Sequence, residues 1–144
     1  TVDAPKCQGV AAHFANRKRF ELTDVTIESE NDFGSVMVVP LDDKPLSQSG
    51  KVLVQVGTQC RPTGWKTEPV TIKPKNGKPV QGKKITSYGK APWAVEQAKV
   101  TVHIKNKGLT KAVVLDPNGL PGEEIPVENG AITFPKDALH VVLQ

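Results

Sequence analysis

Turn-forming residues interrupt this chain at short intervals along its whole length. The sequence contains twelve glycines and twelve prolines. Proline does not fit the interior of a helix and glycine weakens one, so little room remains for a long helix. The strongest turn signals fall at residues 42–45, 76–79, 106–108, 116–119 and 128–130. The Asn-Gly pairs at residues 76–77 and 129–130 are typical of tight β-hairpins. The pattern therefore predicts many short strands.

Between the turns, apolar residues alternate with polar ones, as in strands that bury one face. Val52, Val54 and Val56 show this alternation. Residues 20–27 show it with a change of phase at Asp24, which predicts a β-bulge. Residues 33–41 are almost continuously apolar and predict a strand buried on both faces. Further strands are expected at residues 70–72, 100–105, 112–115, 131–134 and 140–143. This spacing predicts an antiparallel β-sandwich of the immunoglobulin-like or jelly-roll type.

The chain of 144 residues is long enough for one hydrophobic core and shows no internal boundary, so we expect a single domain over residues 1–144. Its least apolar stretch, residues 73–90, predicts a long hairpin or loop. The apolar runs are too short to span a bilayer, and we expect no membrane partner. The first residues lack the pattern of a signal peptide and the last strand-like run is apolar. We therefore expect a domain taken from a longer chain.

The two cysteines, Cys7 and Cys60, allow two interpretations. A disulfide between them would place the protein outside the cytoplasm, and it is the alternative we favour. Otherwise both are free, buried thiols. Neither cysteine has the neighbouring ligands of a metal site.

No catalytic arrangement is evident, and we expect no enzymatic activity from this chain alone. The histidines His13, His103 and His140 lie in strand-like alternations, which favours a place on the outer face of a strand. The acidic residues 28–32 predict a solvated turn. Structural calcium is the less favoured alternative there, because the segment lacks the ligand spacing of a calcium loop. No other cofactor is expected.

A lysine-rich stretch lies between Lys73 and Lys90. Single-stranded nucleic acid binding requires aromatic side chains interleaved with the basic ones, and this stretch contains only Tyr88. A solvated basic surface is the favoured interpretation, and we expect no nucleic acid partner.

The two tryptophans are the most informative side chains. Trp65 and Trp93 each follow a turn, and an indole at a loop edge either covers the end of a core or stacks on the apolar face of a sugar ring. For each tryptophan taken alone, the core role is favoured. In a glycan site, Tyr88 is a third stacking residue. The polar side chains expected to bind sugar hydroxyls are those of Arg61, Gln59 and Glu96.

Several phrases of the sequence resemble the C-terminal β-sandwich domains of large bacterial multidomain glycoside hydrolases. Residues 41–54 are similar to that family's "LDGKPLxxSxRLLV" segment, and residues 2–10 to its "VDTPRTQGV" segment. Residues 63–64, 92–96 and 113–119 fit the same pattern, so the likeness spans nearly the whole chain. It rests on scaffold and turn residues.

The resemblance implies an accessory domain outside the cytoplasm, either extracellular or periplasmic. Its implied partners are polysaccharide and the catalytic domain of the same chain. Cys7 stands where the family has threonine and Cys60 where it has a small residue, which supports their pairing. Trp65 replaces an aliphatic residue and favours a sugar-binding surface. We therefore predict a non-catalytic carbohydrate-binding domain. The alternative is a purely structural sandwich that stabilises a neighbouring catalytic domain.

Overall fold

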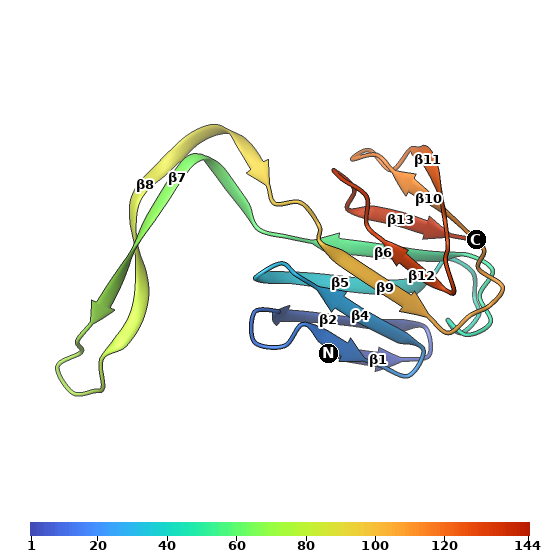
Figure 1. Ribbon diagram of the computed structural model, residues 1–144, viewed down its shortest axis with the longest axis horizontal. Helices are drawn as coiled ribbons and strands as arrows, with labels where there is room; N and C mark the ends of the chain where they lie inside the picture. Colours follow the sequence, from blue (N-terminus) through green and yellow to red (C-terminus); the bar gives the residue numbers. More distant parts are fainter. The chain divides into compact units, whose positions relative to one another are not determined.

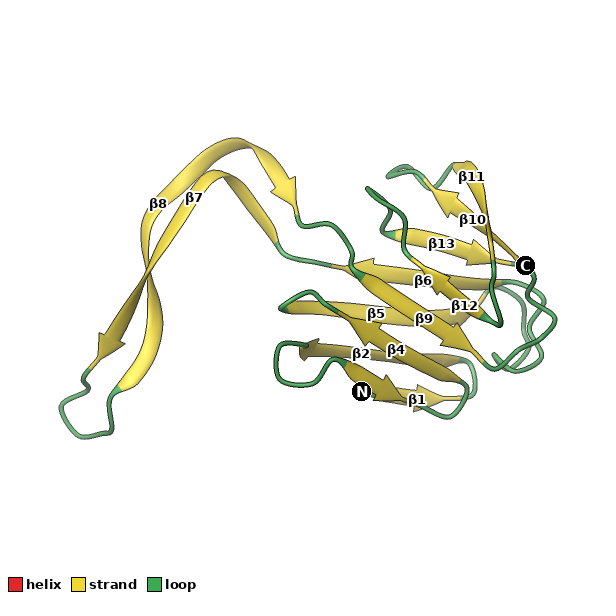
Figure 2. Cartoon of the chain, viewed as in Figure 1, coloured by secondary structure: helices red, strands yellow, loops and turns green.

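The computed structural model describes residues 1–144 as strands and loops without any helix (Figure 2). This confirms the all-β sandwich predicted from the sequence. The chain divides into two compact units. We call Thr1–Thr58 together with Gln97–Gln144 the sandwich unit, and Gln59–Glu96 the hairpin unit. The hairpin unit is thus an insertion between two consecutive strands of the sandwich, a division that the sequence does not signal.

The larger sheet of the sandwich unit has seven antiparallel strands in the order β1-β2-β5-β6-β13-β10-β11 (Figure 1). Along the central strands, buried residues alternate with more exposed ones, as expected for strands with one face on the core. The strands of this sheet are β1 (Val2–Ala4), β2 (Cys7–His13), β5 (Phe33–Pro40), β6 (Val52–Gly57), β13 (His140–Leu143), β10 (Lys111–Leu115) and β11 (Pro121–Pro126).

The smaller sheet has four antiparallel strands in the order β12-β9-β4-β3. They are β12 (Ala131–Thr133), β9 (Val100–Ile104), β4 (Val25–Ser29) and β3 (Arg19–Glu21). The Asn-Gly pair at 129–130 makes the turn before β12, and Asn129 and Gly130 both have positive φ angles, 52° and 79°. Such angles at both central residues are what a tight hairpin turn requires.

A single hydrophobic core joins the two sheets. Val36, Val54 and Val141 from the larger sheet and Ile27 and Val102 from the smaller one are fully buried. Each such side chain contributes about 1.5–3 kcal/mol by leaving water. The core therefore stabilises the sandwich unit.

Residues 41–51, which link β5 to β6 and carry most of the family-like segment, are held by hydrogen bonds from the rest of the sandwich unit and within the segment. Asn106, itself buried, donates from Nδ2 to the carbonyl oxygens of Leu46 at 2.9 Å and Ser49 at 2.8 Å. Leu46 is fully buried. Asp42 accepts the backbone N–H of Gly50 at 2.9 Å. The segment therefore has a structural role in this fold.

Two predicted strands differ from the structure. The change of phase at Asp24 is a chain reversal rather than a bulge: Leu22 N–H donates to the Val25 carbonyl at 2.8 Å, and Phe20 pairs with Ile27 across the turn. Strand β5 buries only alternate residues, because its second face is an outer face of the sandwich. Phe33 is 42% exposed there, so an apolar run did not imply burial on both sides.

The hairpin unit consists of two long antiparallel strands, β7 (Cys60–Ile72) and β8 (Val80–Val95). The Asn-Gly pair at 76–77 lies in the loop between them, as predicted. The register shifts between Pro62 and Thr63 and again between Lys66 and Thr67. No residue of Gln59–Glu96 is buried. The paired strands extend well beyond the predicted hairpin or loop at 73–90, because strands that bury neither face show no apolar alternation.

Candidate functional site

All six residues predicted to bind glycan lie in the hairpin unit. Arg61 and Trp65 are in β7, and Tyr88 and Trp93 are in β8. Gln59 and Glu96 flank the two strands, and the Glu96 N–H donates to the Gln59 carbonyl at 2.9 Å. Both flanking residues are half-buried. The antiparallel pairing of β7 with β8 therefore brings the six residues into one hairpin. Four of them, Gln59, Arg61, Trp65 and Tyr88, form a connected group.

That group is built around Trp65. Trp65 pairs directly with Tyr88 across the two strands, and their ring centroids are 5.8 Å apart at an interplanar angle of 83°. The Arg61 guanidinium carbon lies 4.8 Å from the centroid of the Trp65 ring. Arg61 Nη2 also donates to Gln59 Oε1 at 3.2 Å. Edge-to-face aromatic pairs and cation–π contacts are both favourable, so Arg61, Trp65 and Tyr88 support one another's positions.

The aromatic residues differ in their access to solvent. Tyr88 is 71% exposed and Trp93 is 65% exposed, whereas Trp65 is half-buried. Because the guanidinium of Arg61 covers the indole of Trp65, this indole packs against Arg61 and Tyr88 and is less open to a ligand. Tyr88 is the open stacking surface of the group. The prediction that a tryptophan covers the end of a core is thus wrong for Trp93. Trp65 packs against Arg61 and Tyr88 within the hairpin unit.

Glycine at position 89 allows the strands to approach here. Gly89 has a φ of +67°, and a Cβ at this position would lie 2.5 Å from the Thr63 carbonyl oxygen and 2.8 Å from the Trp65 nitrogen. Gly64 on the opposite strand also has a positive φ of +83°. Any other residue at 89 would push apart the two strands that carry Trp65 and Tyr88.

Trp93 faces the other way. It pairs with Pro62, and side chains alternate along a strand, so it lies on the face opposite Arg61. Its neighbour Pro92 accepts a hydrogen bond from Thr63 Oγ1 at 2.7 Å. The predicted site therefore divides into two, with Gln59, Arg61, Trp65 and Tyr88 on one face and Trp93 on the other.

We call the side of the hairpin that carries Arg61, Trp65 and Tyr88 the aromatic face. The register adds two lysines to it, since Lys90 pairs with Thr63 and Lys83 with Pro69. The only acidic residue within the two strands, Glu68, pairs with Lys84 on the opposite face. The aromatic face within the strands is therefore purely cationic. Both lysines belong to the basic stretch between Lys73 and Lys90, but only the pairing register decides that they share a face with Tyr88.

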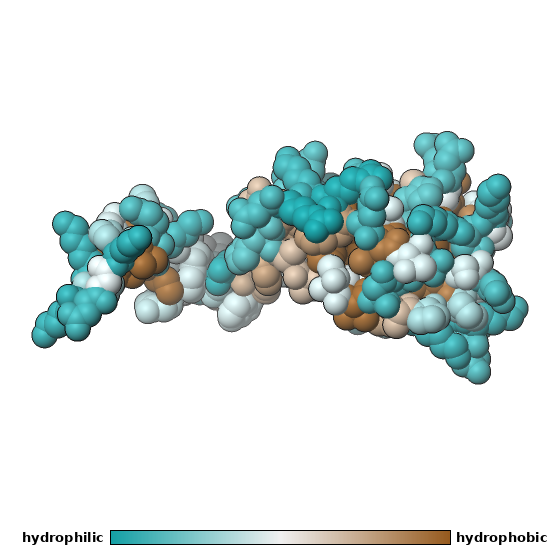
Figure 3. Space-filling model, turned by 90° about the horizontal axis from the view of Figure 1, so that it is seen from below, coloured by the Kyte–Doolittle hydropathy of each residue, from teal (hydrophilic) through white to brown (hydrophobic).

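Exposed apolar residues continue along the hairpin towards its loop. Ile72 is 54% exposed, its partner Val80 is 56% exposed and Ile85 is 38% exposed. Figure 3 shows hydrophobic surface on the hairpin unit between hydrophilic side chains. Isolated two-stranded hairpins have little stability of their own, so contact with a ligand or partner would order this unit further.

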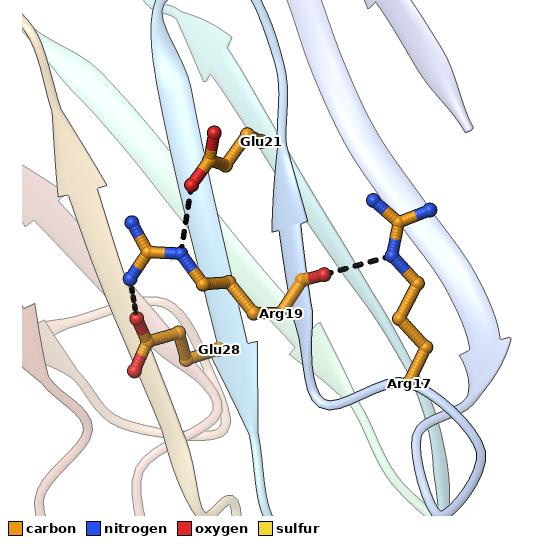
Figure 4. A network of polar contacts seen from close by, with 4 residues as sticks. All are labelled: Arg17, Arg19, Glu21 and Glu28. Carbon is orange, nitrogen blue, oxygen red and sulfur yellow. Dashed lines mark hydrogen bonds and ion pairs between the residues drawn. The ribbon is translucent and has the colours of Figure 1, made fainter.

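A second surface lies on the outer face of the smaller sheet. A shallow, open pocket there is lined by Arg19, Glu21, Glu28, Thr101 and His103, among others. Arg19 donates from Nε to Glu21 at 2.9 Å, forms an ion pair with Glu28, and accepts at its carbonyl from Arg17 at 2.9 Å (Figure 4). His103 lies on this outer face, as predicted. No aromatic side chain lines the pocket apart from this imidazole, and Arg19 already pairs with both Glu21 and Glu28.

The acidic segment 28–32 is only in part the solvated turn that the sequence predicted: Glu28, Glu30 and Asp32 are exposed, but the segment is not a turn throughout. Glu28 and Ser29 belong to β4, and Asn31 is buried. Asn31 donates from Nδ2 to the Gln97 carbonyl and accepts from the Lys99 N–H, both at 2.8 Å. The structure contains no group of three or more His, Cys, Asp or Glu side chains arranged to hold a metal ion.

The predicted disulfide is absent, because both cysteines are free thiols. Cys7 begins β2 in the sandwich unit and is half-buried, whereas Cys60 begins β7 in the hairpin unit and is exposed. A disulfide requires Cα atoms about 4.4–6.8 Å apart. Spacing along the sequence does not specify that distance, which explains why the pairing could not be derived from two cysteines alone.

The structure contains no helix with the length and apolar character needed to cross a membrane. Comparisons with family models, with curated proteins and with solved structures found no match to this chain.

Proposed function

We propose that this chain is a non-catalytic domain that binds polysaccharide through the aromatic face of its hairpin unit. The observation that carries the proposal is the exposed ring of Tyr88, held edge-to-face against Trp65 while Arg61 covers the indole. A glycan ring presents C–H groups on its faces and hydroxyls at its edge. An open phenol beside fixed hydrogen-bonding side chains complements both.

The polar neighbours supply the second part of the site. Arg61 has donors that its contact with Gln59 leaves available, since a guanidinium carries five N–H groups. The Gln59 amide offers a donor to the same ligand. Trp93 provides a separate stacking surface on the opposite face. A long glycan that contacts both faces would stack one sugar on Tyr88 and another on Trp93. These features favour a polymer over a small molecule, because Tyr88 and Trp93 are both open to solvent.

The proposed context is an accessory domain of a polysaccharide-degrading enzyme that acts outside the cytoplasm. It rests on the family resemblance of residues 2–10 and 41–54. In that context, catalysis belongs to a separate domain of the parent chain. This chain holds the substrate near that domain.

Affinity electrophoresis in gels containing plant and algal polysaccharides tests the proposal. Migration of the unaltered protein should slow in at least one gel, and Tyr88→Ala should restore free migration. Phe33→Ala is the matched control, because Phe33 is also an exposed aromatic residue but lies in the sandwich unit. Unchanged migration in every gel, or equal effects of the two substitutions, would contradict glycan binding at this face.

A second function is favoured by the apolar side chains near the hairpin loop. Ile72 and Val80 are each more than half exposed, which suits packing on a neighbouring catalytic domain. If the hairpin unit serves this purpose, adding the catalytic domain of the parent chain should reduce iodide quenching of Trp93 fluorescence. Ile72→Ser should abolish that protection. Quenching that is unaffected by the catalytic domain would exclude this role.

A further inference from the structure

The basic residues of this protein are concentrated in one unit. The hairpin unit contains seven lysines and one arginine against two glutamates, a net charge of +6, whereas the whole chain has a net charge of +4. The sandwich unit therefore has a net charge of −2. The basic character of the protein belongs entirely to the unit that also presents Tyr88 and Trp93.

The pairing register concentrates this charge further. On the aromatic face, Arg61, Lys83 and Lys90 accompany Trp65 and Tyr88. Glu68 lies on the other face, opposite Lys84. Lys73, Lys75 and Lys78 extend the same sign into the loop, and all three are exposed. A polymer lying along this face would meet cations repeatedly and no carboxylate within the two strands.

We propose that the natural ligand of the aromatic face is an anionic polysaccharide, bearing sulfate or carboxylate groups. This inference rests on the proposed function and adds the charge of the glycan to it. Arginine forms paired hydrogen bonds with carboxylate and other oxyanions, and lysine acts as a point charge. Stacking on Tyr88 would fix the position of a sugar ring. The flanking cations would then bind the acidic groups of neighbouring rings.

A single-stranded nucleic acid is also an anionic polymer, but the structure favours it less. Such ligands stack successive bases on a series of aromatic side chains along one groove. Here Arg61 already covers Trp65, and Trp93 lies on the opposite face. One open ring per face suits an isolated sugar contact better than a row of stacked bases.

The test uses polymers that share a backbone and differ in charge. Hydroxyethyl cellulose, carboxymethyl cellulose and cellulose sulfate form one set, and agarose with a sulfated galactan forms a second. The full chain should bind charged members of a set and show little binding to the neutral one. The carboxymethylated and sulfated members distinguish the two acidic groups. Raising sodium chloride from about 50 mM to about 500 mM should weaken binding, because salt screens exposed charges.

Substitutions that remove lysine charges test whether the aromatic face binds the anionic polymer. The double variant Lys83→Gln/Lys90→Gln should weaken binding by about fivefold to tenfold, as expected for two exposed ion pairs. The matched control is Lys107→Gln/Lys136→Gln, which removes the same charge from exposed positions of the sandwich unit. Circular dichroism and thermal unfolding of both variants confirm that they are folded. Equal effects of the two double variants would overturn the assignment to the aromatic face.

Failure of this inference is distinguishable from failure of the proposed function. If neutral and charged polymers bind equally and Tyr88→Ala abolishes binding, the glycan site stands and the anionic preference is wrong. If no polymer binds, both are wrong. If charged polymers bind and Tyr88→Ala has no effect, stacking is wrong. Tighter binding of a thymidine oligonucleotide than of every charged glycan would overturn the proposal in favour of nucleic acid.

Discussion

The guanidinium of Arg61 covers the indole of Trp65, with its central carbon 4.8 Å from the ring centroid. This contact leaves Trp65 partly covered and Trp93 as the exposed tryptophan.

The chain has only these two tryptophans, so replacing one of them lets fluorescence report on the other alone. Trp65→Phe leaves Trp93 as the only indole, and Trp93→Phe leaves Trp65. We expect iodide to quench the Trp65→Phe protein more strongly. Adding Arg61→Ala to Trp93→Phe should increase quenching of Trp65, and no increase would contradict the covering role of Arg61.

Gly89→Ala should disturb the hairpin unit and leave the sandwich unit intact. A Cβ at position 89 would lie within 3 Å of backbone atoms of both Thr63 and Trp65, and the positive φ adds strain. Loss of the near-ultraviolet dichroism of the Trp65–Tyr88 pair, with an unchanged melting temperature of the core, is the expected result. Gly119→Ala is the control, because Gly119 also has a positive φ but an added Cβ there meets no atom within 4 Å. Equal changes in the aromatic signal would contradict this role of Gly89.

Asn106→Ala should destabilise the sandwich unit by about 2–4 kcal/mol, because it leaves two buried carbonyl groups without their donor. Those carbonyls belong to Leu46 and Ser49. Urea unfolding followed by circular dichroism measures the loss. Asn76→Ala, in the exposed loop of the hairpin unit, should change the free energy of unfolding by no more than about 0.5 kcal/mol. A small effect at 106 would show that the segment 41–51 holds its position by other contacts.

Two isoleucines provide a matched test of where the core lies. Ile27 is fully buried in β4, whereas Ile72 is 54% exposed in β7. Ile27→Ala should cost about 2–5 kcal/mol of unfolding free energy through lost burial and a residual cavity. Ile72→Ala should cost no more than about 0.5 kcal/mol. Similar losses measured by denaturant unfolding would mean that the hairpin unit has a core that the structure does not show.

Asp116 should make stability depend on acidic pH. Hydrogen bonds, first from the Leu120 N–H and then from the Asn118 N–H, hold its pKa below the ordinary value of 3.8. A lowered folded-state pKa stabilises the protein above 3.8, and this contribution is lost as the pH falls through the folded value. Asp116→Ala should therefore flatten the fall in melting temperature below about pH 4. Asp32→Ala, at an exposed site of the sandwich unit, is the control. An unchanged slope in Asp116→Ala would contradict this assignment.

The glycan site could be predicted in its components but not in its arrangement. Tyr88, Trp65 and Arg61 were identified because aromatic and polar residues at loop edges are chemically suited to sugars. The sequence did not show that Trp93 faces away from them. That separation depends on the register of β7 and β8, including two shifts that place extra residues in β8. A register shift leaves no reliable trace in residue type when neither face of a strand is buried.

The sequence by itself determined the all-β class and most of the strands, since turn residues and apolar alternation act locally. Val100, Val102 and Ile104 are buried in β9 as their spacing predicted. Only the tertiary structure decided that Cys7 and Cys60 remain unpaired, that residues 59–96 form a separate unit, and that Tyr88 lies against Trp65 while Trp93 does not. These outcomes depend on which residues distant in the chain become neighbours. Local propensity does not encode that choice, whereas strand pairing and its register do.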